Sequence, residues 1–227
     1  MALTDRYRRT ADLPRRLPLF PLRGVLLLPR VGLPLNIFEP RYLSMLDDAI
    51  AGERMIGIIQ PAASAEAVES PAGMSVELRR VGCAGRITAF QEQDDGRCAI
   101  TLTGICRFEV VSEIPSMKPY RTCTAGYDRF AHDLQPGSGE ADVDRDTLLK
   151  TLRAYTEARQ MQADWSAIQR AQSEALVNTL SIISPYGPEE KQALLEAGDL
   201  RTRAELLVAL AEMELAAQGG SSGSTLQ

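Results

Sequence analysis

The sequence predicts an α+β protein in which a β-sheet domain is followed by a bundle of α-helices. Two differences in composition support this prediction. Residues 17–130 are rich in Pro, Gly, Val and Ile, and their short apolar runs between turn residues are typical of strands. Residues 142–217 are rich in Ala, Leu, Glu, Gln and Arg, with apolar residues at helical spacing. Between them, the Pro- and Gly-containing residues 131–141 are predicted to be a linker.

The overall composition is that of an ordinary globular protein. Of the 227 residues, 44% are hydrophobic and 24% are charged, so the chain can bury a sizeable core and is not intrinsically disordered as a whole. Lysine and arginine total 25 against 30 acidic residues, which gives a net charge of −5. General nucleic-acid binders carry a basic excess, so we do not expect a nucleic-acid partner.

Neither end of the chain predicts a membrane segment. Residues 1–16 form a charged N-terminal segment, and the apolar stretch that follows is interrupted by Arg23 and by prolines. Residues 218–227 are rich in Gly and Ser, which predicts a disordered tail.

The four cysteines show no C-x-x-C spacing, and a chain of this length does not need disulfides to fold. We expect reduced cysteines, a cytoplasmic location and no membrane association.

The first part of the β domain is predicted to contain short strands and one helix. Residues 25–28 and 33–38 are apolar runs bounded by Pro and Gly, which favours strands. Pro40 favours a helix start and Gly52 favours its end, so a helix is predicted over residues 40–51. Residues 55–59 form the next expected strand, and residues 61–75 form a polar loop.

Residues 76–114 predict a long β-hairpin. Asp95-Gly96 is a strong two-residue turn signal, and with that turn Cys83 faces Phe108. One face is then expected to be buried, and the other, which includes Arg86 and Arg107, is expected to be solvated. A hairpin of this length with several glycines favours a barrel or half-barrel. The expected buried face holds Cys83, Ile87, Ala89, Cys98, Ile100, Leu102, Cys106, Phe108 and Val110.

The second domain is predicted to be a small bundle of four amphipathic helices. Apolar residues recur at helical spacing over residues 148–155 and 168–183, and Pro185 ends the second helix. Pro188 favours the start of a short third helix, which ends at Gly198. Thr202 and Glu205 have the spacing of a capping box, which predicts the start of the last helix. Short connections favour packing of these helices into one bundle.

The sequence contains no motif for catalysis or cofactor binding. It lacks a phosphate-binding loop, a G-x-S-x-G nucleophile elbow and an H-E-x-x-H metal motif. His132 lies in the expected linker, where we interpret it as a solvated side chain. Three cysteines fall on the expected buried face of the hairpin and are interpreted as small core residues. We therefore predict a protein that is not an enzyme, with no catalytic residues, no metal site and no cofactor.

Residues 17–42 hold the candidate binding residues and a candidate structural corner. Short apolar runs can supply either a hydrophobic groove or a barrel core, and both interpretations stay open. In the corner, the Glu39 carboxylate complements the helix dipole, and Arg41 and Tyr42 tie the helix to neighbouring strands. The candidate polypeptide-binding residues are Phe20, Leu22, Leu27 and Phe38.

Two segments near the N-terminus also carry a family resemblance. They are L-P-L-F-P-L-R-G-V at residues 17–25 and L-N-I-F-E-P-R-Y at residues 35–42, supported by residues 82–87 and 102–108. Together they resemble the N-terminal substrate-binding domain of the Lon protease, over residues 17–215. The resemblance implies a PUA-like β pseudo-barrel followed by helices. Because the sequence has neither a P-loop nor a Ser/Lys protease module, it looks like a stand-alone bacterial form without the ATPase and protease modules.

The resemblance also implies a function. The Lon domain helps to recognise unfolded or tagged polypeptides and supports assembly, so we expect a polypeptide-binding module, acting as an adaptor or chaperone-like factor in protein quality control, with self-association left open. RNA binding, which PUA-like folds also host, is an alternative that the acidic composition disfavours. A small-molecule enzyme is a second alternative, and the lack of a catalytic constellation disfavours it.

Overall fold

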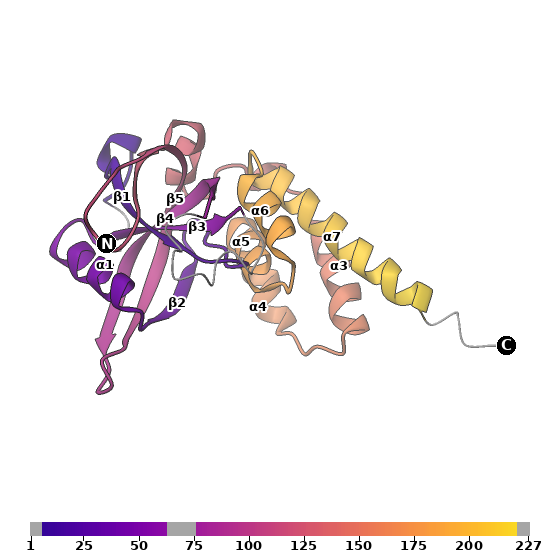
Figure 1. Ribbon diagram of the computed structural model, residues 1–227. Coiled ribbons are helices and arrows are strands. Elements are labelled where there is room, and N and C mark those ends of the chain that lie inside the picture. Colours follow the sequence, from indigo (N-terminus) through magenta and orange to yellow (C-terminus); the bar gives the residue numbers. More distant parts are fainter. Residues whose placement is uncertain (1–5, 63–75, 222–227) are drawn as a thin grey trace. The chain divides into compact units, whose positions relative to one another are not determined.

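The structure, a computed structural model, describes residues 6–62 and 76–221, with side chains as far as Ala217 in the last helix. These residues form two units, shown in Figure 1. The residues up to Pro136, together with Pro185–Leu195, form a β unit. The residues of Gly137–Ser184 and those from Glu196 onward form a helical unit. The α+β class predicted from the sequence is therefore confirmed.

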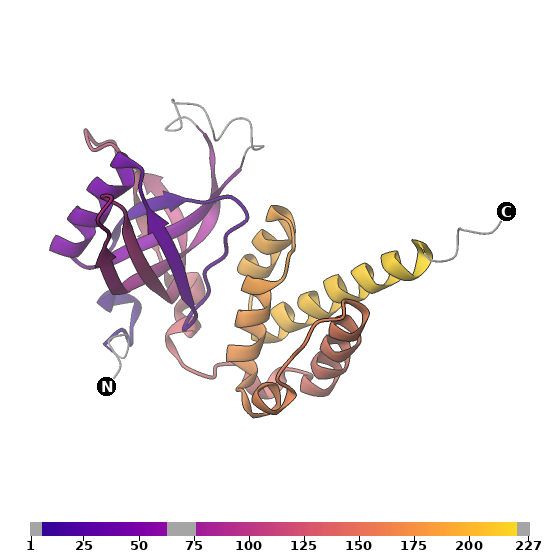
Figure 2. The same ribbon diagram turned by 90° about the horizontal axis from the view of Figure 1, so that it is seen from below.

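The sheet of the β unit closes into a barrel. Its strand order is β2-β5-β4-β3-β1-β6, and β5 also pairs with β6, so five strands form a ring and β2 lies at an edge. β1 pairs with β3 in parallel and the other pairings are antiparallel. The curvature of the sheet is clearest in Figure 2. The strands are β1 (Arg16–Pro21), β2 (Gly32–Ile37), β3 (Met55–Pro61), β4 (Leu78–Glu92), β5 (Cys98–Glu113) and β6 (Thr122–Gly126).

Large side chains fill the barrel where glycines make room for them. Leu17, Leu19 and Phe108 are completely buried. A Cβ atom on Gly57 would lie 2.8 Å from the Leu17 side chain and 2.9 Å from the Phe108 ring. A Cβ atom on Gly82 would lie 2.7 Å from the same ring. The aromatic ring therefore occupies space that only glycine leaves open, and the two glycines are part of the core packing.

Helix α1 (Pro40–Ala51) lies where the sequence predicts it. Pro40 occupies the first turn, where its missing N–H costs no hydrogen bond, and the Gly52 N–H donates to the carbonyls of Asp48 and Ala49 at the C-terminus. The helix buries Tyr42, Met45, Leu46 and Ala49. The expected strand at residues 55–59 is also present, within β3. Of the expected loop at residues 61–75, residues 63–75 lie outside the described chain.

The expected strand at residues 25–28 is wrong. The first strand is β1, and residues 25–28 form an irregular segment whose side chains at 26–28 are nonetheless buried. Directly after it, the Arg30 N–H donates to the Gly104 carbonyl at 2.8 Å, and the Gly104 N–H donates to the Val31 carbonyl at 3.0 Å. A Cβ atom on residue 104 would collide with the Leu28 carbonyl. The apolar run therefore crosses β5 at a glycine instead of extending the sheet.

The β4–β5 hairpin forms, but with a different turn and register. The Gln93 N–H donates to the Arg97 carbonyl at 2.8 Å, so the connection is longer than the expected two residues. Bulges shift the pairing, and Cys83 lies opposite Arg107 instead of Phe108. Ala89, expected in the core, is exposed.

The expectation of a solvated second face is also wrong. Arg86 and Arg107 are only 7% and 1% exposed. Arg107 contacts residues of η2 (Asp128–Leu134) and α6 (Pro188–Glu196), two elements that are distant in the sequence and cover this part of β5. The hairpin is therefore buried on both faces near its base.

Helix α6 belongs to the β unit, although the sequence placed it in the helical bundle of residues 142–217. Buried amides account for this position. Gln60 Nε2 of β3 donates to the Pro188 carbonyl at 3.0 Å and to Gln192 Oε1 at 3.1 Å. Gln192 Nε2 in turn donates to the Val81 carbonyl of β4 at 3.2 Å. The expected linker at residues 131–141 likewise differs, because residues 131–134 complete η2 and bury Leu134.

The helical unit consists of α3 (Arg145–Ala158), α4 (Trp165–Arg170), α5 (Ser173–Ile183) and α7 (Leu200–Ser221), preceded by the short η3 (Glu140–Asp142). Helices α3 and α5 both pack against α7. The single helix expected over residues 168–183 is two helices, because Ala171 and Gln172 adopt extended backbone conformations between them.

The last helix starts before the expected capping box. Helix α7 begins at Leu200, and Asp199 Oδ1 accepts a hydrogen bond from the Thr202 N–H at 2.7 Å. Its backbone continues to Ser221, into the expected tail, whereas residues 222–227 lie outside the described chain. Within the described ranges, no helix combines the length and the apolar character needed to cross a bilayer.

Candidate functional site

Two of the four candidate binding residues lie in the core. Phe20 is 5% exposed and its ring lies 4.3 Å from that of Tyr42, and Leu27 is 1% exposed. Leu22 is half-buried. Phe38, in contrast, is 63% exposed. The interpretation as barrel core therefore holds for Phe20 and Leu27, and of the four candidates only Phe38 offers a large exposed side chain.

The corner formed by Glu39, Arg41 and Tyr42 holds α1 against the barrel. Arg41 Nε donates to Glu39 Oε2 at 2.9 Å, and its guanidinium carbon lies 4.6 Å from the centre of the Tyr42 ring. Because Tyr42 also packs on Phe20, the corner links the start of α1 to β1. The Glu39 side chain accepts no hydrogen bond from the helix N-terminus, and its backbone carbonyl accepts those of Tyr42 and Leu43.

An apolar surface crosses the edge strand and the outer half of the hairpin. Leu35 of β2 pairs with Ile100 of β5, which pairs with Phe90 of β4, so the three side chains lie in one row on one face of the sheet. Phe90 is 43% exposed and Leu35 is half-buried. Phe38 follows directly after β2. It is not part of this row but lies at the end of the same edge strand. We use the name β2–hairpin surface for the region of the edge strand and the hairpin that carries Leu35, Phe38 and Phe90.

The surroundings of the β2–hairpin surface are acidic. Asp47 of α1 and Glu92 of β4 both lie near the Cys98 thiol and raise its pKa, although burial of the thiol is the larger cause. Asp94 lies in the hairpin loop that follows. Among the described residues, these three carboxylates form no ion pair. The surface therefore combines exposed aromatic rings with uncompensated negative charge.

The β2–hairpin surface also includes an open strand edge. β2 pairs with β5 along one side, and no described strand pairs with its other side. Pro34 lies in the middle of this strand, where its missing N–H limits pairing with a further strand. The edge is thus accessible but poorly suited to continuous strand addition.

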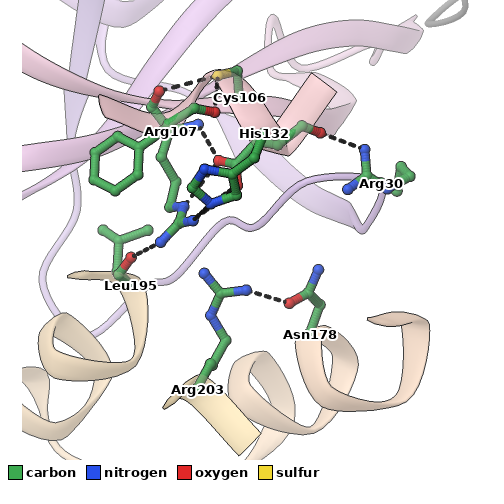
Figure 3. Close-up of polar contacts among 9 residues, drawn as sticks. Arg30, Cys106, Arg107, His132, Asn178, Leu195 and Arg203 are labelled. Carbon is green, nitrogen blue, oxygen red and sulfur yellow. Dashed lines mark hydrogen bonds and ion pairs between the residues drawn. The ribbon is translucent and has the colours of Figure 1, made fainter. Parts of the chain in front are cut away.

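A buried polar cluster lies at the base of the hairpin, where the sequence predicted solvent. The Arg107 guanidinium forms two hydrogen bonds with the Asp133 carboxylate, at 2.8 and 2.9 Å. It also donates to the Leu195 carbonyl at 3.0 Å (Figure 3). His132 Nε2 lies 3.0 Å from Arg107 Nη2, so the histidine is not the isolated, solvated side chain that was expected. The cluster connects β5, η2 and α6, so its residues have a structural role.

The described residues form no metal-binding cluster, and two buried thiols have a raised pKa. No three side chains among His, Cys, Asp and Glu in the described ranges are arranged to hold a metal ion. Burial raises the pKa of the Cys123 thiol to about 12 and also raises the pKa of the Cys106 thiol. Both thiols are therefore protonated at neutral pH and are poor nucleophiles. None of the four cysteines forms a disulfide.

Comparison with known proteins identifies the family. The sequence pattern of the ATP-dependent protease La (LON) substrate-binding domain matches residues 16–212, which is most of the chain. The chain belongs to the Lon substrate-binding domain family. The resemblance seen in the sequence at residues 17–215 is therefore confirmed.

Curated Lon proteases share this domain with the chain. The Lon protease of Flavobacterium johnsoniae is 26% identical over 198 residues, covering 85% of this chain and 23% of the relative. That of Parabacteroides distasonis is 27% identical over 204 residues, covering 87% of this chain and 24% of the relative. The chain thus spans about a quarter of the length of the curated relatives that it matches.

Solved structures support the same fold. The Lon N-terminal domain protein from Xanthomonas campestris superposes with a TM-score of 0.60 at 22% identity, covering 86% of this chain and 97% of that structure. The N-terminal domain of the Mycobacterium avium complex Lon protease superposes with a TM-score of 0.62 at 17% identity, covering 87% and 98%. At these identities the likeness shows the fold alone.

Most residues of the Lon resemblance serve the fold. The L-P-L-F-P segment at residues 17–21 lies in β1, and Tyr42 packs on Phe20 within the barrel. Phe38 belongs to the same pattern but contributes little to the core, because nearly two thirds of it is exposed. Sequence patterning could identify Phe38 as apolar, but it could not separate it from its buried neighbours. Phe90 was not among the candidates, although the expected alternation, with Ala89 buried, places residue 90 on the solvated face. Its pairing with Ile100 follows from the shifted register of the hairpin.

Proposed function

We propose that this chain is a non-catalytic polypeptide-binding module that holds exposed apolar segments of unfolded chains. It would act as an adaptor or chaperone-like factor in protein quality control. The observation that carries the proposal is the exposure of two aromatic rings, Phe38 and Phe90, on the β2–hairpin surface. Membership of the Lon substrate-binding domain family supports it, as does the name of that family.

The chemistry of the surface suits an unfolded segment with apolar side chains. Two phenylalanine rings offer area for contact without hydrogen-bonding requirements, so they bind apolar side chains with little sequence specificity. The nearby carboxylates of Asp47 and Glu92 favour segments with basic residues over segments with acidic ones. A tag added to a substrate would bind through the same surface if it carried apolar side chains.

The proposal is tested by fluorescence anisotropy with a labelled polypeptide that cannot fold, such as a reduced and alkylated protein. The same polypeptide in its folded, disulfide-bonded form is the control. We expect saturable binding of the unfolded form alone. Replacement of both rings, Phe38→Ser with Phe90→Ser, is expected to weaken binding about tenfold, because a few aromatic residues dominate the binding free energy of most interfaces.

A matched variant separates this surface from general hydrophobicity. Met117 is fully exposed in the loop between β5 and β6, outside the β2–hairpin surface, so Met117→Ser removes exposed apolar area without touching the proposed site. It should bind like the unmodified chain. Equal weakening by Met117→Ser and by the double phenylalanine variant would reject the assignment to the β2–hairpin surface. Failure of the unfolded polypeptide to bind would reject the function.

A further inference from the structure

A cavity lies in the helical unit, on a surface that the proposed function does not use. It has a volume of about 400 Å³ and lies between α3 and α4, the helices labelled in Figure 1. Leu149, Ala154 and Trp165 supply its apolar lining. Trp165 is half-buried and is the one tryptophan of the chain. We call this cavity the Trp165 groove.

Local hydrogen bonds fix the shape of the groove. Asp164 Oδ1 accepts a hydrogen bond from the Ala167 N–H at 3.0 Å, which caps α4 directly before Trp165. Arg145, at the start of α3, donates to the carbonyls of Ile168 and Gln169 at 3.0 Å each. The short helix α4 is therefore capped at its N-terminus and bonded to α3 near its C-terminus, so the tryptophan is held in place before any ligand binds.

The groove carries positive charge with no carboxylate bound to it. Lys150 and Arg153 both line the cavity and are exposed, and neither forms an ion pair among the described residues. The Arg153 guanidinium carbon lies 4.8 Å from the centre of the Trp165 ring, which orients the cation across the apolar lining. Glu157, one turn further along α3, is the single acidic residue of the lining.

The face of α3 that forms the groove differs from the face that packs in the helical unit. Tyr155, on the packed face, donates a hydrogen bond to Glu214 of α7 at 2.9 Å. Leu149, Arg153 and Glu157 follow one another at four-residue intervals and therefore form a separate stripe. The cations of the groove are thus not needed to hold α3 against α7.

From these observations we propose that the Trp165 groove binds an acidic segment of a partner protein, in which carboxylates flank an apolar side chain. The apolar side chain packs on Trp165 and Leu149, and the carboxylates pair with Lys150 and Arg153. These two cations lie on successive turns of α3, so they match two carboxylates that are about one helical turn apart. A polyphosphate ligand is less well matched, because Glu157 lies at the same rim.

The test uses the intrinsic fluorescence of Trp165 in the full chain. The probe is a synthetic, tryptophan-free amphipathic peptide with Glu flanking Leu in each repeat, and a peptide with Lys in place of Glu is the charge control. At low salt, we expect the Glu peptide to change the Trp165 emission in a saturable manner, and the Lys peptide to cause no change. Binding should weaken as salt is added, because the pairs are exposed to solvent.

Charge reversal sharpens the test. Lys150→Glu with Arg153→Glu is expected to weaken binding of the Glu peptide at least about tenfold, and to allow the Lys peptide to bind instead. Arg80→Glu makes the same kind of change on an exposed residue of β4 and should leave binding unaltered. Circular dichroism checks that each variant is folded. The Phe38→Ser, Phe90→Ser variant should bind the Glu peptide like the unmodified chain, which separates this site from the β2–hairpin surface.

Three outcomes would overturn the proposal. Unchanged affinity of the Glu peptide for the charge-reversed variant would place its binding elsewhere. A stronger Trp165 response to ATP than to the peptide would assign the groove to a polyphosphate. A concentration-dependent dimer that is lost on charge reversal, with no peptide binding, would assign it to a second copy of the chain.

Discussion

The β unit and the helical unit each bury an arginine, and they do so with different partners. In the β unit, Arg107 is 1% exposed and pairs with the carboxylate of Asp133 at 2.8 Å. In the helical unit, Arg203 is 3% exposed and donates to the amide oxygen of Asn178 at 2.8 Å. Figure 3 shows both arginines. Asp133 supplies a carboxylate to the first arginine, whereas Asn178 supplies an amide oxygen to the second.

This difference extends to how each unit is specified. In the β unit, Arg107 joins segments that are far apart in the sequence, since Asp133 and Leu195 lie 26 and 88 residues from it. The helices of the other unit begin at local caps, such as Asp144 for α3 and Asp164 for α4. Loss of the buried pair that joins distant segments should therefore cost more than loss of a local helix cap.

The largest effect is expected for Asp133→Ala. It leaves the Arg107 guanidinium buried without its carboxylate, and removal of one partner of a buried pair costs about 3–5 kcal/mol in the free energy of unfolding. Urea denaturation followed by circular dichroism measures this loss. Hydrogen exchange should show faster exchange of the β5 amides, because the Arg107 N–H itself donates to Asp133.

A double variant separates the buried charge from simple loss of packing. Arg107→Met with Asp133→Leu removes both charges and keeps apolar volume, and such replacements are often neutral or stabilising. We therefore expect the double variant to be more stable than Asp133→Ala alone. If it is equally unstable, the cost arises from packing and the comparison between the two arginines fails.

The Arg107 cluster also shows why the sequence did not predict the burial of this face of the hairpin. Alternation along the hairpin placed Arg107 on a solvated face, because the pattern assumes that one face of a hairpin meets water. Residues 128–134 and 188–196 cover that face, and nothing near Arg107 in the sequence indicates it. Helix α1, in contrast, was predicted with its observed bounds, because Pro40 and Gly52 are local signals. The bounds of α1 follow from local signals, whereas the burial of Arg107 depends on distant segments.

The candidate surface follows the same rule. Phe38 was identified because its apolar character and position before a helix are visible in the sequence. Its distinction from Phe20 is a matter of burial, which depends on the closure of the barrel by β6 and the stacking of Tyr42. The row that Phe90 shares with Ile100 and Leu35 could be placed only once the bulge between Ile87 and Ala89 was known. The exposure of Phe38 and the pairing of Phe90 could therefore be seen only in the tertiary structure.

An intermediate effect is expected for Asn178→Ala in the helical unit. It removes the amide oxygen that accepts a hydrogen bond from the buried Arg203, and loss of such a bond costs about 1–3 kcal/mol. Urea unfolding monitored by Trp165 fluorescence measures it, since this tryptophan lies in the helical unit. Leu180→Ala, in the same helix and half-buried, is a control for loss of side-chain volume. A loss as large as that of Asp133→Ala would remove the distinction between the two partners.

A smaller effect is expected for Asp144→Ala, which removes the cap of α3. The backbone N–H of Thr147 donates to the Asp144 carboxylate and is the main reason that its pKa lies below the ordinary 3.8. The pKa of Asp144 is lower in the folded chain than in the unfolded chain. The ionised cap therefore stabilises the fold fully above pH 3.8 and loses its effect as the pH falls through the folded pKa. We expect Asp144→Ala to lower Tm by about 2–4 °C at pH 7. The difference should shrink below pH 3.8, and a difference that persists there would contradict the ionised cap.

The smallest effect is expected for Glu205→Gln on the surface of α7. Glu205 accepts a hydrogen bond from Arg201 at 2.8 Å, but the side chains are 60% and 64% exposed. An exposed pair of this kind gains little because water and salt screen it, so Tm should change by less than about 1 °C. The variant keeps the shape of the side chain and removes only its charge. Since Asp133→Ala and Glu205→Gln each take one carboxylate from an arginine, the contrast between their effects measures what burial adds to an ion pair. Similar shifts in Tm for both would show that the surrounding solvent, and not the fold, sets the strength of these pairs.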